Sequence, residues 1–308
     1  MFAMIRSGSV IRAYLSRLKH KKLLGNIYKM SPLNNKHTFE RFVVGPSNQL
    51  AHAASIAVAM QPAKKYNPLF IYSGYGLGKT HLLHAIGLLT ASLHPEFNIQ
   101  YVTGEEFMNE LFNAIRYDLI PKFREKYSKI DFLLFDDIHY LAGKERTQEE
   151  FWRIFRSLHD SEKQIVFASD KFTNDISNLE ERLRANFEWG LIIDIQPPEM
   201  ETRLAIIKNK IKENSIPMSD KISCYIARHV KSNIGELEGF LGLVISYSSL
   251  TGREINLDLV KEVLKIAKLD KTRLTRFHSR MFSVIRRKIL RKERYRFHRK
   301  QARLERMD

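Results

Sequence analysis

Residues 73–80, SGYGLGKT, place three glycines directly before a lysine and a threonine. The apolar run Leu69–Tyr72 precedes them, and an apolar stretch of helical length follows. Glycines let the backbone bend so that successive N–H groups face anionic oxygens, and a following helix adds partial positive charge at its N-terminus. The order of strand, glycine-rich loop and helix therefore predicts a phosphate-binding loop, with Gly74, Gly76 and Gly78 in its bend.

Two residues at the end of this loop could act on a nucleotide. Lys79 would reach the β- and γ-phosphates, and the Thr80 hydroxyl would ligate Mg²⁺. The full pattern has glycine where this chain has Ser73, so a positive φ at that position would be strained. A glycine-rich turn with a chance Lys-Thr pair is the alternative, and the flanking strand and helix argue against it.

A carboxylate on a nearby strand is needed to complete such a site. The apolar run 130–135 ends in Asp136 and Asp137. We expect Asp136 to hold Mg²⁺ through water, and Asp137 to orient or polarise an attacking water molecule. The paired acids could instead cap the following loop. The next apolar run ends in Ser169 and Asp170, which makes Asp170 a candidate sensor of the γ-phosphate.

Strand and helix patterns alternate along the middle of the chain. The segment 105–127 is one of the helix-length stretches between the apolar runs. The alternation predicts a parallel sheet covered on both faces. Pro197 and Pro198 end this pattern, and only helical patterns follow. Five short apolar runs predict strands: Leu69–Tyr72, Ile99–Val102, Phe132–Phe135, Ile165–Ala168 and Leu191–Ile195. Four later segments predict helices: 200–214, 219–230, 234–250 and 257–267.

The net charge of +17 is concentrated at the two ends of the 308-residue chain. Residues 1–36 carry a net charge of +8 and residues 265–308 carry +13, whereas the middle carries −4. Two cationic arms are suited to binding a polyanion, and nucleic acid is a better candidate than a membrane surface. Solvated tails are the alternative for both arms, and an organelle transit peptide is a further alternative for the first. The sequence has no run of eighteen apolar residues, which excludes a spanning helix, and one cysteine, Cys224, which excludes an internal disulfide.

Seven strings of the sequence closely resemble the ATPase core of the bacterial chromosomal replication initiator DnaA, an AAA+ family. The similarity runs from about residue 36 to about residue 268. The strings lie at 38–54, 64–72, 74–87, 132–151, 179–191, 194–206 and 249–255, the longest being FLLFDDIHYLAGKERTQEEF at 132–151.

The resemblance implies a P-loop AAA+ fold of the α/β class. It implies an αβα base with a five-stranded parallel sheet over residues 37–197, followed by a small all-helical lid over 198–268. The basic arms would then be residues 1–36 and 269–308. ATP would bind between base and lid, and the region Val43–Asn48, with Asn48 as a cofactor-binding residue, would contact adenine.

The resemblance also implies assembly with other AAA+ initiator subunits and contact with single-stranded DNA. The matching DNA-contact positions are Phe112, Lys144 and Arg146. An apolar side chain suits a base or sugar and two cations suit phosphates. Phe112 could equally be an ordinary core residue.

Three departures from the family pattern bear on function. First, Asn186 stands where the family has an arginine that reaches the ATP of the next subunit. Second, Gly235 stands where the family has an arginine that senses the γ-phosphate. Loss of an arginine finger costs roughly 10³–10⁵ in rate in related phosphoryl-transfer systems, so we expect very slow hydrolysis. Third, no three-helix pattern typical of the family's origin-reading domain follows residue 268.

These features together predict an ATP-binding, DNA-associated protein that acts in replication initiation or its regulation, with weak ATP hydrolysis. We expect a cytoplasmic, nucleoid-associated location, with organelle import as the alternative. The alternative function is a regulatory AAA+ adaptor, or a degenerate paralogue, that modulates a full-length initiator without reading origin DNA. A helicase-loader-like ATPase fits the strings at 38–54 and 132–151 less well.

Overall fold

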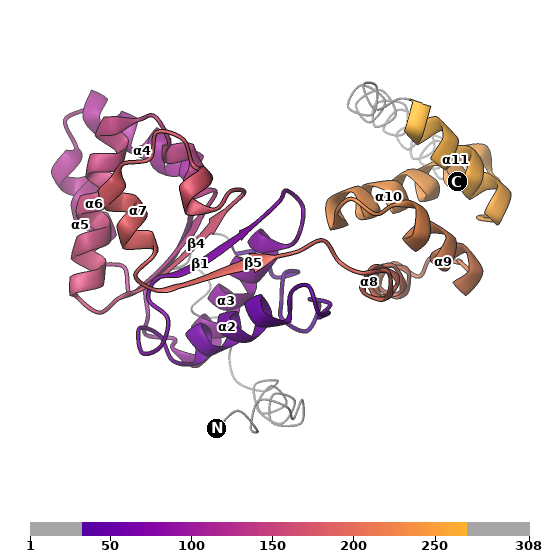
Figure 1. Ribbon diagram of the computed structural model, residues 1–308, viewed down its shortest axis with the longest axis horizontal. Coiled ribbons are helices and arrows are strands. Elements are labelled where there is room, and N and C mark those ends of the chain that lie inside the picture. Colours follow the sequence, from indigo (N-terminus) through magenta and orange to yellow (C-terminus); the bar gives the residue numbers. More distant parts are fainter. Residues whose placement is uncertain (1–32, 270–308) are drawn as a thin grey trace, which may run out of the picture. The chain divides into compact units, whose positions relative to one another are not determined.

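The computed structural model describes residues 33–269, which form two compact units (Figure 1). The first unit runs to Thr202 and also includes Asn233–Gly235, and the second comprises Arg203–Ser232 and the chain from Glu236 onward. The first unit therefore continues a few residues past Pro197 and Pro198. The two basic arms, apart from residues 33–36 and Leu269, lie outside the described residues.

A five-stranded parallel sheet forms the centre of the first unit. Its strand order is β2-β3-β4-β1-β5, so every connection between consecutive strands crosses over the sheet. Every predicted apolar run is a strand, which confirms the predicted sheet. The strands are β1 (Leu69–Ser73), β2 (Ile99–Thr103), β3 (Phe132–Asp136), β4 (Gln164–Ser169) and β5 (Leu191–Ile195).

Helices cover both faces of this sheet (Figure 1). Successive side chains of a strand point to opposite faces, so Phe70 belongs to one core and Leu69 and Ile71 to the other. The core with Leu69 includes residues of α2 (Gln49–Met60) and α3 (Lys79–Leu93). The core with Phe70 includes residues of α4 (Gly104–Arg116), α5 (Ile120–Ser128), α6 (Glu145–Asp160) and α7 (Glu181–Phe187).

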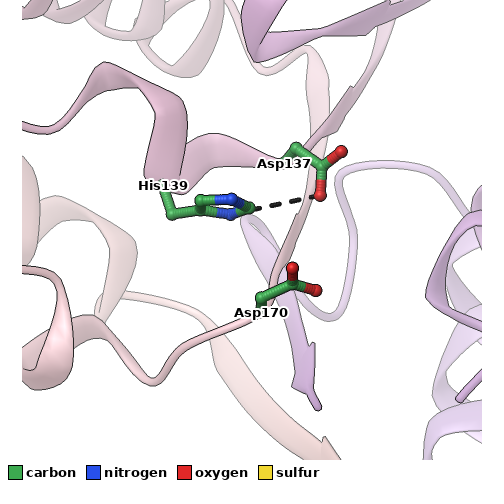
Figure 2. A group of neighbouring side chains, drawn as sticks. All are labelled: Asp137, His139 and Asp170. Carbon is green, nitrogen blue, oxygen red and sulfur yellow. Dashed lines mark ion pairs between the residues drawn. The ribbon is translucent and has the colours of Figure 1, made fainter. Parts of the chain in front are cut away.

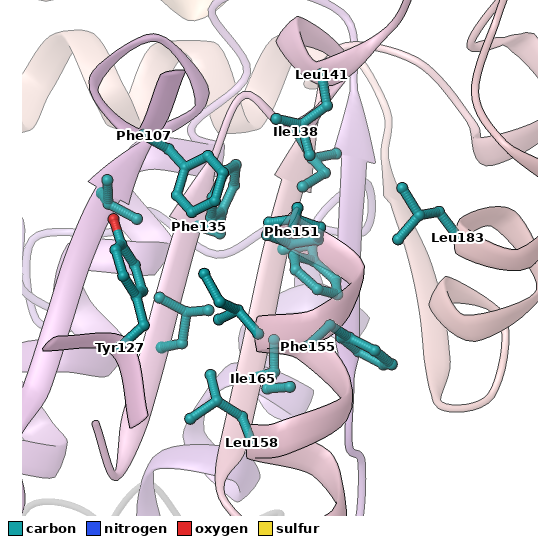
Figure 3. Close-up of a cluster of buried hydrophobic side chains, with 14 of the residues drawn as sticks. Phe107, Tyr127, Phe135, Ile138, Leu141, Phe151, Phe155, Leu158, Ile165 and Leu183 are labelled. Carbon is teal, nitrogen blue, oxygen red and sulfur yellow. The ribbon is translucent and has the colours of Figure 1, made fainter. Parts of the chain in front are cut away.

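Aromatic rings fill the second of these cores (Figure 3). Phe167 on β4 is fully buried, and its ring centroid lies 4.8 Å from that of Phe187 and 6.0 Å from that of Phe151. Phe135 on β3 packs against Phe151 at 4.9 Å in a T-shaped arrangement. Such pairs add to the stabilisation from area burial, and they hold β3 and β4 under α6.

The segment 105–127 is not one helix, which corrects the expectation from its length. Helix α4 ends at Arg116, and Asp118 adopts a left-handed conformation with φ of 55°. The Leu119 N–H donates to the Ala114 carbonyl at 2.7 Å, a Schellman-type ending. Helix α5 then begins with proline in its first turn. The residue at this turn is an aspartate. Glycine adopts the left-handed conformation most readily, and asparagine and aspartate tolerate it better than other residue types do.

The second unit consists of helices in the region that the structure describes. They are α8 (Met200–Glu213), α9 (Asp220–His229), α10 (Ile234–Thr251) and α11 (Leu257–Leu269), and each matches a predicted helix. Short 3₁₀ segments occur in the first unit at Ile138–Leu141 and Thr173–Asp175. Among residues 33–269, no helix combines the length and the apolar character that crossing a membrane requires.

Candidate functional site

The sheet order brings the predicted site residues to one edge. Strand β4 pairs with both β1 and β3, and all three run parallel. Their carboxyl ends are Ser73, Ser169 and Asp136. The glycine-rich loop, Asp137 and Asp170 follow these ends directly, so loops far apart in sequence begin side by side. This is the position at which open parallel sheets bind ligands.

The glycine-rich loop needs glycine at two positions. Gly76 has φ of 73° and Gly78 has φ of 101°. A Cβ at Gly76 would lie 2.9 Å from Asn233 Oδ1, and one at Gly78 would lie 3.0 Å from the Phe42 ring. Ser73 instead ends β1 in extended backbone, and its hydroxyl donates to the Gly74 carbonyl at 2.8 Å. The strain expected at Ser73 is therefore absent, because the left-handed turns fall on glycines.

Lys79, the first residue of α3, is buried beneath this loop. Its Nζ donates to the Ser73 carbonyl, the Ser73 hydroxyl and the Gly74 carbonyl, each at 3.1 Å. It also forms an ion pair with Asp170 Oδ1 at 2.6 Å. A buried ammonium needs such partners, because desolvation penalises an unpaired charge. The structure therefore brings Lys79 and Asp170 into direct contact beside the loop.

The next residue, Thr80, bonds to the carboxylate of β3. Its Oγ1 donates to Asp136 Oδ2 at 2.7 Å. Tyr101 on β2 donates its hydroxyl to the same oxygen at 3.0 Å, and the Asp137 N–H donates to Asp136 Oδ1 at 3.0 Å. Both carboxylate oxygens are therefore fixed in direction. Burial and the Asp136 carboxylate raise the pKa of Tyr101, which keeps its phenol protonated as a donor.

The next residue, Asp137, has a different environment and lies near His139 and Asp170 (Figure 2). Its backbone is left-handed with φ of 55°. Burial first, and then repulsion by Asp136, raises the pKa of the Asp137 carboxyl, while His139 acts in the opposite direction. A carboxylate with a raised pKa is a better proton acceptor than an ordinary surface aspartate. The structure thus brings Asp137, Asp170 and Lys79 together at the loop, as the sequence predicts.

Asn48 has a local role in the structure. It precedes α2 and is 3% exposed. Its Nδ2 donates to the Val43 carbonyl at 3.0 Å, and its Oδ1 accepts the Gly45 N–H at 2.9 Å. Both polar atoms of the side chain are thus bonded to the loop 43–48. Asn48 shapes the segment that the resemblance places against adenine.

The predicted DNA-contact residues lie on the surface. Phe112 on α4 is 62% exposed, which excludes the alternative that it is a core residue. Lys144 and Arg146, at the start of α6, are exposed as well. The Lys144 Nζ donates to the Tyr140 carbonyl at 2.6 Å and lies over the Tyr140 ring. These residues present one apolar surface and two cations, on different elements.

The two positions that depart from the arginine pattern differ in their surroundings. Asn186 on α7 is 5% exposed, and its buried Nδ2 has no hydrogen-bond partner among the described residues. Gly235 borders the glycine-rich loop, because its N–H donates to the Gly76 carbonyl at 3.2 Å. Among the described residues, a Cβ at Gly235 would lie 3.3 Å from Asn233 Oδ1, a tight contact, and 3.8 Å from Gly76 Cα. A side chain at Gly235 therefore requires a small shift of the Asn233 side chain.

Two further residues belong to the site without having been predicted. Tyr101 contacts Asp136 across strands β2 and β3, a pairing that the apolar pattern of β2 does not reveal. His139 places its Nδ1 4.0 Å from Asp137 Oδ1. The spacing Asp137-x-His139 was visible in the sequence and is the signal that could have found it.

The residues present fit a nucleotide phosphate with its metal. Gly78 caps α3 without a side chain, which leaves the first-turn N–H groups to an anion. Lys79 supplies a cation at the same place, and Thr80 and Asp136 supply a hydroxyl and a carboxylate, the oxygen donors that Mg²⁺ prefers. The left-handed glycines keep the loop open to close approach.

A strand, a phosphate loop, a second strand with paired acids and this strand order define a P-loop protein with the AAA+ base architecture. Residues 33–194 match the family model of the bacterial DnaA ATPase domain. The chain belongs to this family.

Relatives and solved structures agree with this assignment. The chromosomal replication initiator protein DnaA of Caldanaerobacter subterraneus subsp. tengcongensis is 53% identical over 244 residues, which are 79% of this chain and 55% of that protein. Domain III of DnaA from Thermotoga maritima superposes with a TM-score of 0.73 at 39% identity, covering 76% of this chain and 98% of that one. The structure of a replication initiator DnaA bound to AMPPCP and single-stranded DNA superposes with a TM-score of 0.63 at 30% identity. The match covers 77% of this chain and 82% of that one. The chain spans about half the length of the curated relatives it matches.

A buried histidine beside the site makes stability depend on pH. His84 on α3 is 6% exposed and packs against the Tyr101 ring in a tilted arrangement with ring centroids 4.4 Å apart. Burial first, and then the proximity of His37 and His81, lowers the pKa of His84 to about 4. The neutral ring is thus favoured in the folded state and protonation opposes folding.

We expect the free energy of unfolding to fall by up to roughly 3 kcal/mol as pH drops from about 6.5, the unfolded value, to about 4. The contribution of His84 to the free energy of unfolding is fully present at pH values above the pKa of the histidine in the unfolded chain. His84→Gln should flatten the decline in urea unfolding measured across this range, and His229→Gln, at an exposed position on α9, should preserve it. A decline that is equally steep in His84→Gln would contradict the assignment.

Proposed function

We propose that the chain binds ATP with Mg²⁺ and acts in the initiation of chromosomal DNA replication. The single observation that carries this proposal is the position of Lys79. Its Nζ lies under the glycine-rich loop, bonded to Ser73 and to Asp170 at the end of a neighbouring strand. Family membership supplies the biological setting.

Each residue of the loop edge has a defined role in this proposal. The N–H groups of the loop with Gly74, Gly76 and Gly78 bind phosphate oxygens, and Lys79 neutralises the β- and γ-phosphates. Thr80 and Asp136 would hold Mg²⁺, which supplies charge stabilisation when bound. The Tyr101 hydroxyl keeps the Asp136 carboxylate in one orientation. Asp137 accepts a proton from the attacking water, and Asp170 takes part in sensing the γ-phosphate.

Hydrolysis is expected to be slow. Asn186 supplies no charge at the position of the intersubunit arginine, and Gly235 supplies no side chain near the loop. Assembly with other AAA+ initiator subunits is part of the proposal, and its dependence on ATP should be weak for the same reason. DNA contact would come from Phe112, Lys144 and Arg146 and from the basic arms.

Lys79→Ala tests the phosphate site directly. Removal of the ammonium should weaken binding of a fluorescent ATP analogue by at least about tenfold, since a charge-assisted phosphate contact is lost. Lys208→Ala, which removes an exposed lysine on α8 paired with Asp220, is the matched control and should bind as the parent does. Equal binding by Lys79→Ala and the parent would overturn the phosphate-site assignment.

Gly235→Arg tests the cause of the slow hydrolysis. A Cβ at Gly235 needs only a small shift of the Asn233 side chain, so an arginine there should raise the preference for ATP over ADP and increase turnover severalfold or more. Gly239→Arg is the control on the same helix, because no described residue lies within 4 Å of a Cβ at that position. Single-turnover hydrolysis with both variants is the measurement. A turnover already comparable to arginine-containing family members would contradict the proposal of slow hydrolysis.

A second candidate function is a regulatory adaptor that binds a full-length initiator. The observation that favours it is the burial of Asn186 at 5% exposure, which leaves the corresponding face without its cation. An adaptor could use its intact nucleotide-binding face while the other face is inactive. The cationic arms favour the DNA-associated function instead.

DNA binding separates the two candidates. Phe112→Ala together with Lys144→Ala and Arg146→Ala should weaken binding to a single-stranded oligonucleotide and reduce the slope of log K against log[salt] by about 1.4, or about 0.7 for each lost phosphate contact. Lys208→Ala again serves as control. Unchanged affinity and slope would favour the adaptor. An origin duplex bound at least about tenfold more tightly than a scrambled one, a difference of roughly 1.4 kcal/mol, would favour the initiator role.

A further inference from the structure

Three side chains gather beside the glycine-rich loop and form a group that we call the Asp-His-Asp triad: Asp137, His139 and Asp170 (Figure 2). One ligand atom of each lies within 4.8 Å of the other two. Asp137 and His139 come from the segment after β3, and Asp170 comes from the end of β4. The nucleotide role described above uses the two carboxylates and leaves the imidazole without a function.

The distances within the triad are close to those of ligands around one ion, the ligand atoms lying within 4.8 Å of one another. His139 Nδ1 lies 4.0 Å from Asp137 Oδ1, which is too long for a hydrogen bond. Two ligand atoms that each lie about 2.1 Å from a shared cation are separated by at most about 4.2 Å. The His139–Asp137 separation lies inside this limit, whereas a separation of 4.8 Å exceeds it, so a small side-chain rotation is needed for all three ligand atoms to bind one ion.

The state of His139 Nδ1 is the second, independent observation. This nitrogen is buried and has no hydrogen-bond partner among the described residues. A buried polar atom without a partner is uncommon and calls for an explanation. A neutral imidazole nitrogen is also the commonest protein ligand for metals. A cation between His139 and Asp137 would satisfy this nitrogen.

The geometry points to a binding site for a transition-metal divalent cation at the Asp-His-Asp triad, distinct from the Mg²⁺ position of Thr80 and Asp136. One imidazole and two carboxylates are the ligand set of a transition metal, because Mg²⁺ prefers oxygen donors alone. Affinity should follow the usual order for nitrogen and oxygen ligands, so Co²⁺ and Zn²⁺ bind more tightly than Mn²⁺.

The positive charge of Lys79 disfavours a cation at the triad, and this lysine connects the triad to the glycine-rich loop. Its Nζ pairs with Asp170 Oδ1 at 2.6 Å, so the ammonium competes with a cation for the same carboxylate. Removal of the lysine side chain would free Asp170 and take away a positive charge. The same substitution that weakens ATP binding should therefore strengthen metal binding.

Co²⁺ titration of the full chain without nucleotide tests the inference. The visible d–d absorption of Co²⁺ shifts and strengthens when protein ligands replace water, and calorimetry gives the affinity. His139→Gln should lower the affinity by at least about tenfold and remove the absorption change, because an inner ligand is lost. His159→Gln is the matched control: that ring also lies near one carboxylate, at 3.7 Å from Asp160, but outside any triad in the described part of the chain.

Three outcomes would overturn the inference: no absorption change in the parent, a change that persists in His139→Gln, or an equal loss in His159→Gln. Lys79→Ala supplies a further readout, and a severalfold tighter Co²⁺ affinity is expected. An unchanged or weaker affinity would contradict the placement of the ion beside Asp170. The inference does not rest on nucleotide binding. If Lys79→Ala bound ATP as tightly as the parent, the phosphate-site assignment would fail, but the Co²⁺ result would be unaffected.

Discussion

The burial of the Lys79 ammonium constrains the rest of the first unit. A charge that is 6% exposed requires acceptors on every side, and it obtains them from two residues of the glycine-rich loop and from Asp170. The loop must therefore close over the lysine, and β4 must end next to β1. Parallel strands with crossover helices place both ends at one edge. The aromatic core under α6 holds β4 in that position.

Asp136 connects the outer half of the sheet to the same edge. It accepts hydrogen bonds from α3 through Thr80 and from β2 through Tyr101. The Tyr101 ring in turn packs against His84, which lies one turn beyond Thr80 on α3. A metal-binding carboxylate is only useful when its orientation is fixed, and this network of partners fixes it. Among the described residues, the neighbouring Asp137 carboxylate has no comparable set of hydrogen bonds, which agrees with the proton-accepting role proposed for it.

The chain combines a glycine-rich loop closed over Lys79 with two positions, Asn186 and Gly235, at which the family resemblance implies arginine. In the proposed function the loop binds phosphate, and Asn186 and Gly235 supply no positive charge. Binding and hydrolysis are thereby separable in physical terms, because binding depends on the loop and hydrolysis on charge supplied at the γ-phosphate. The Asp-His-Asp triad lies at the same end of the loop and offers a place for positive charge that does not come from an arginine.

The strands and the phosphate loop were predictable because their signals are local. A buried parallel strand needs a short apolar run, and β1 to β5 each have one that is bounded by polar or turn residues. Gly76 and Gly78 were predictable because left-handed turns favour glycine, and the four helices after Pro198 because their apolar residues recur with helical spacing. Helix-length periodicity did not reveal the break at Asp118, since one left-handed residue leaves the apolar pattern on both sides intact.

The sequence by itself determined the class of fold, the loop that would bind phosphate and the acids that would complete it. Only the tertiary structure decided which residues meet. The hydroxyl of Tyr101 reaches Asp136 because β2 pairs with β3, and Asp170 reaches Lys79 because β4 pairs with β1. The tertiary structure also decided that the Asn48 side chain hydrogen-bonds to the backbone of the loop 43–48 and that Phe112 is exposed. The physical reason is that residue type and spacing encode burial and local conformation, whereas contacts between distant residues follow from strand order and packing.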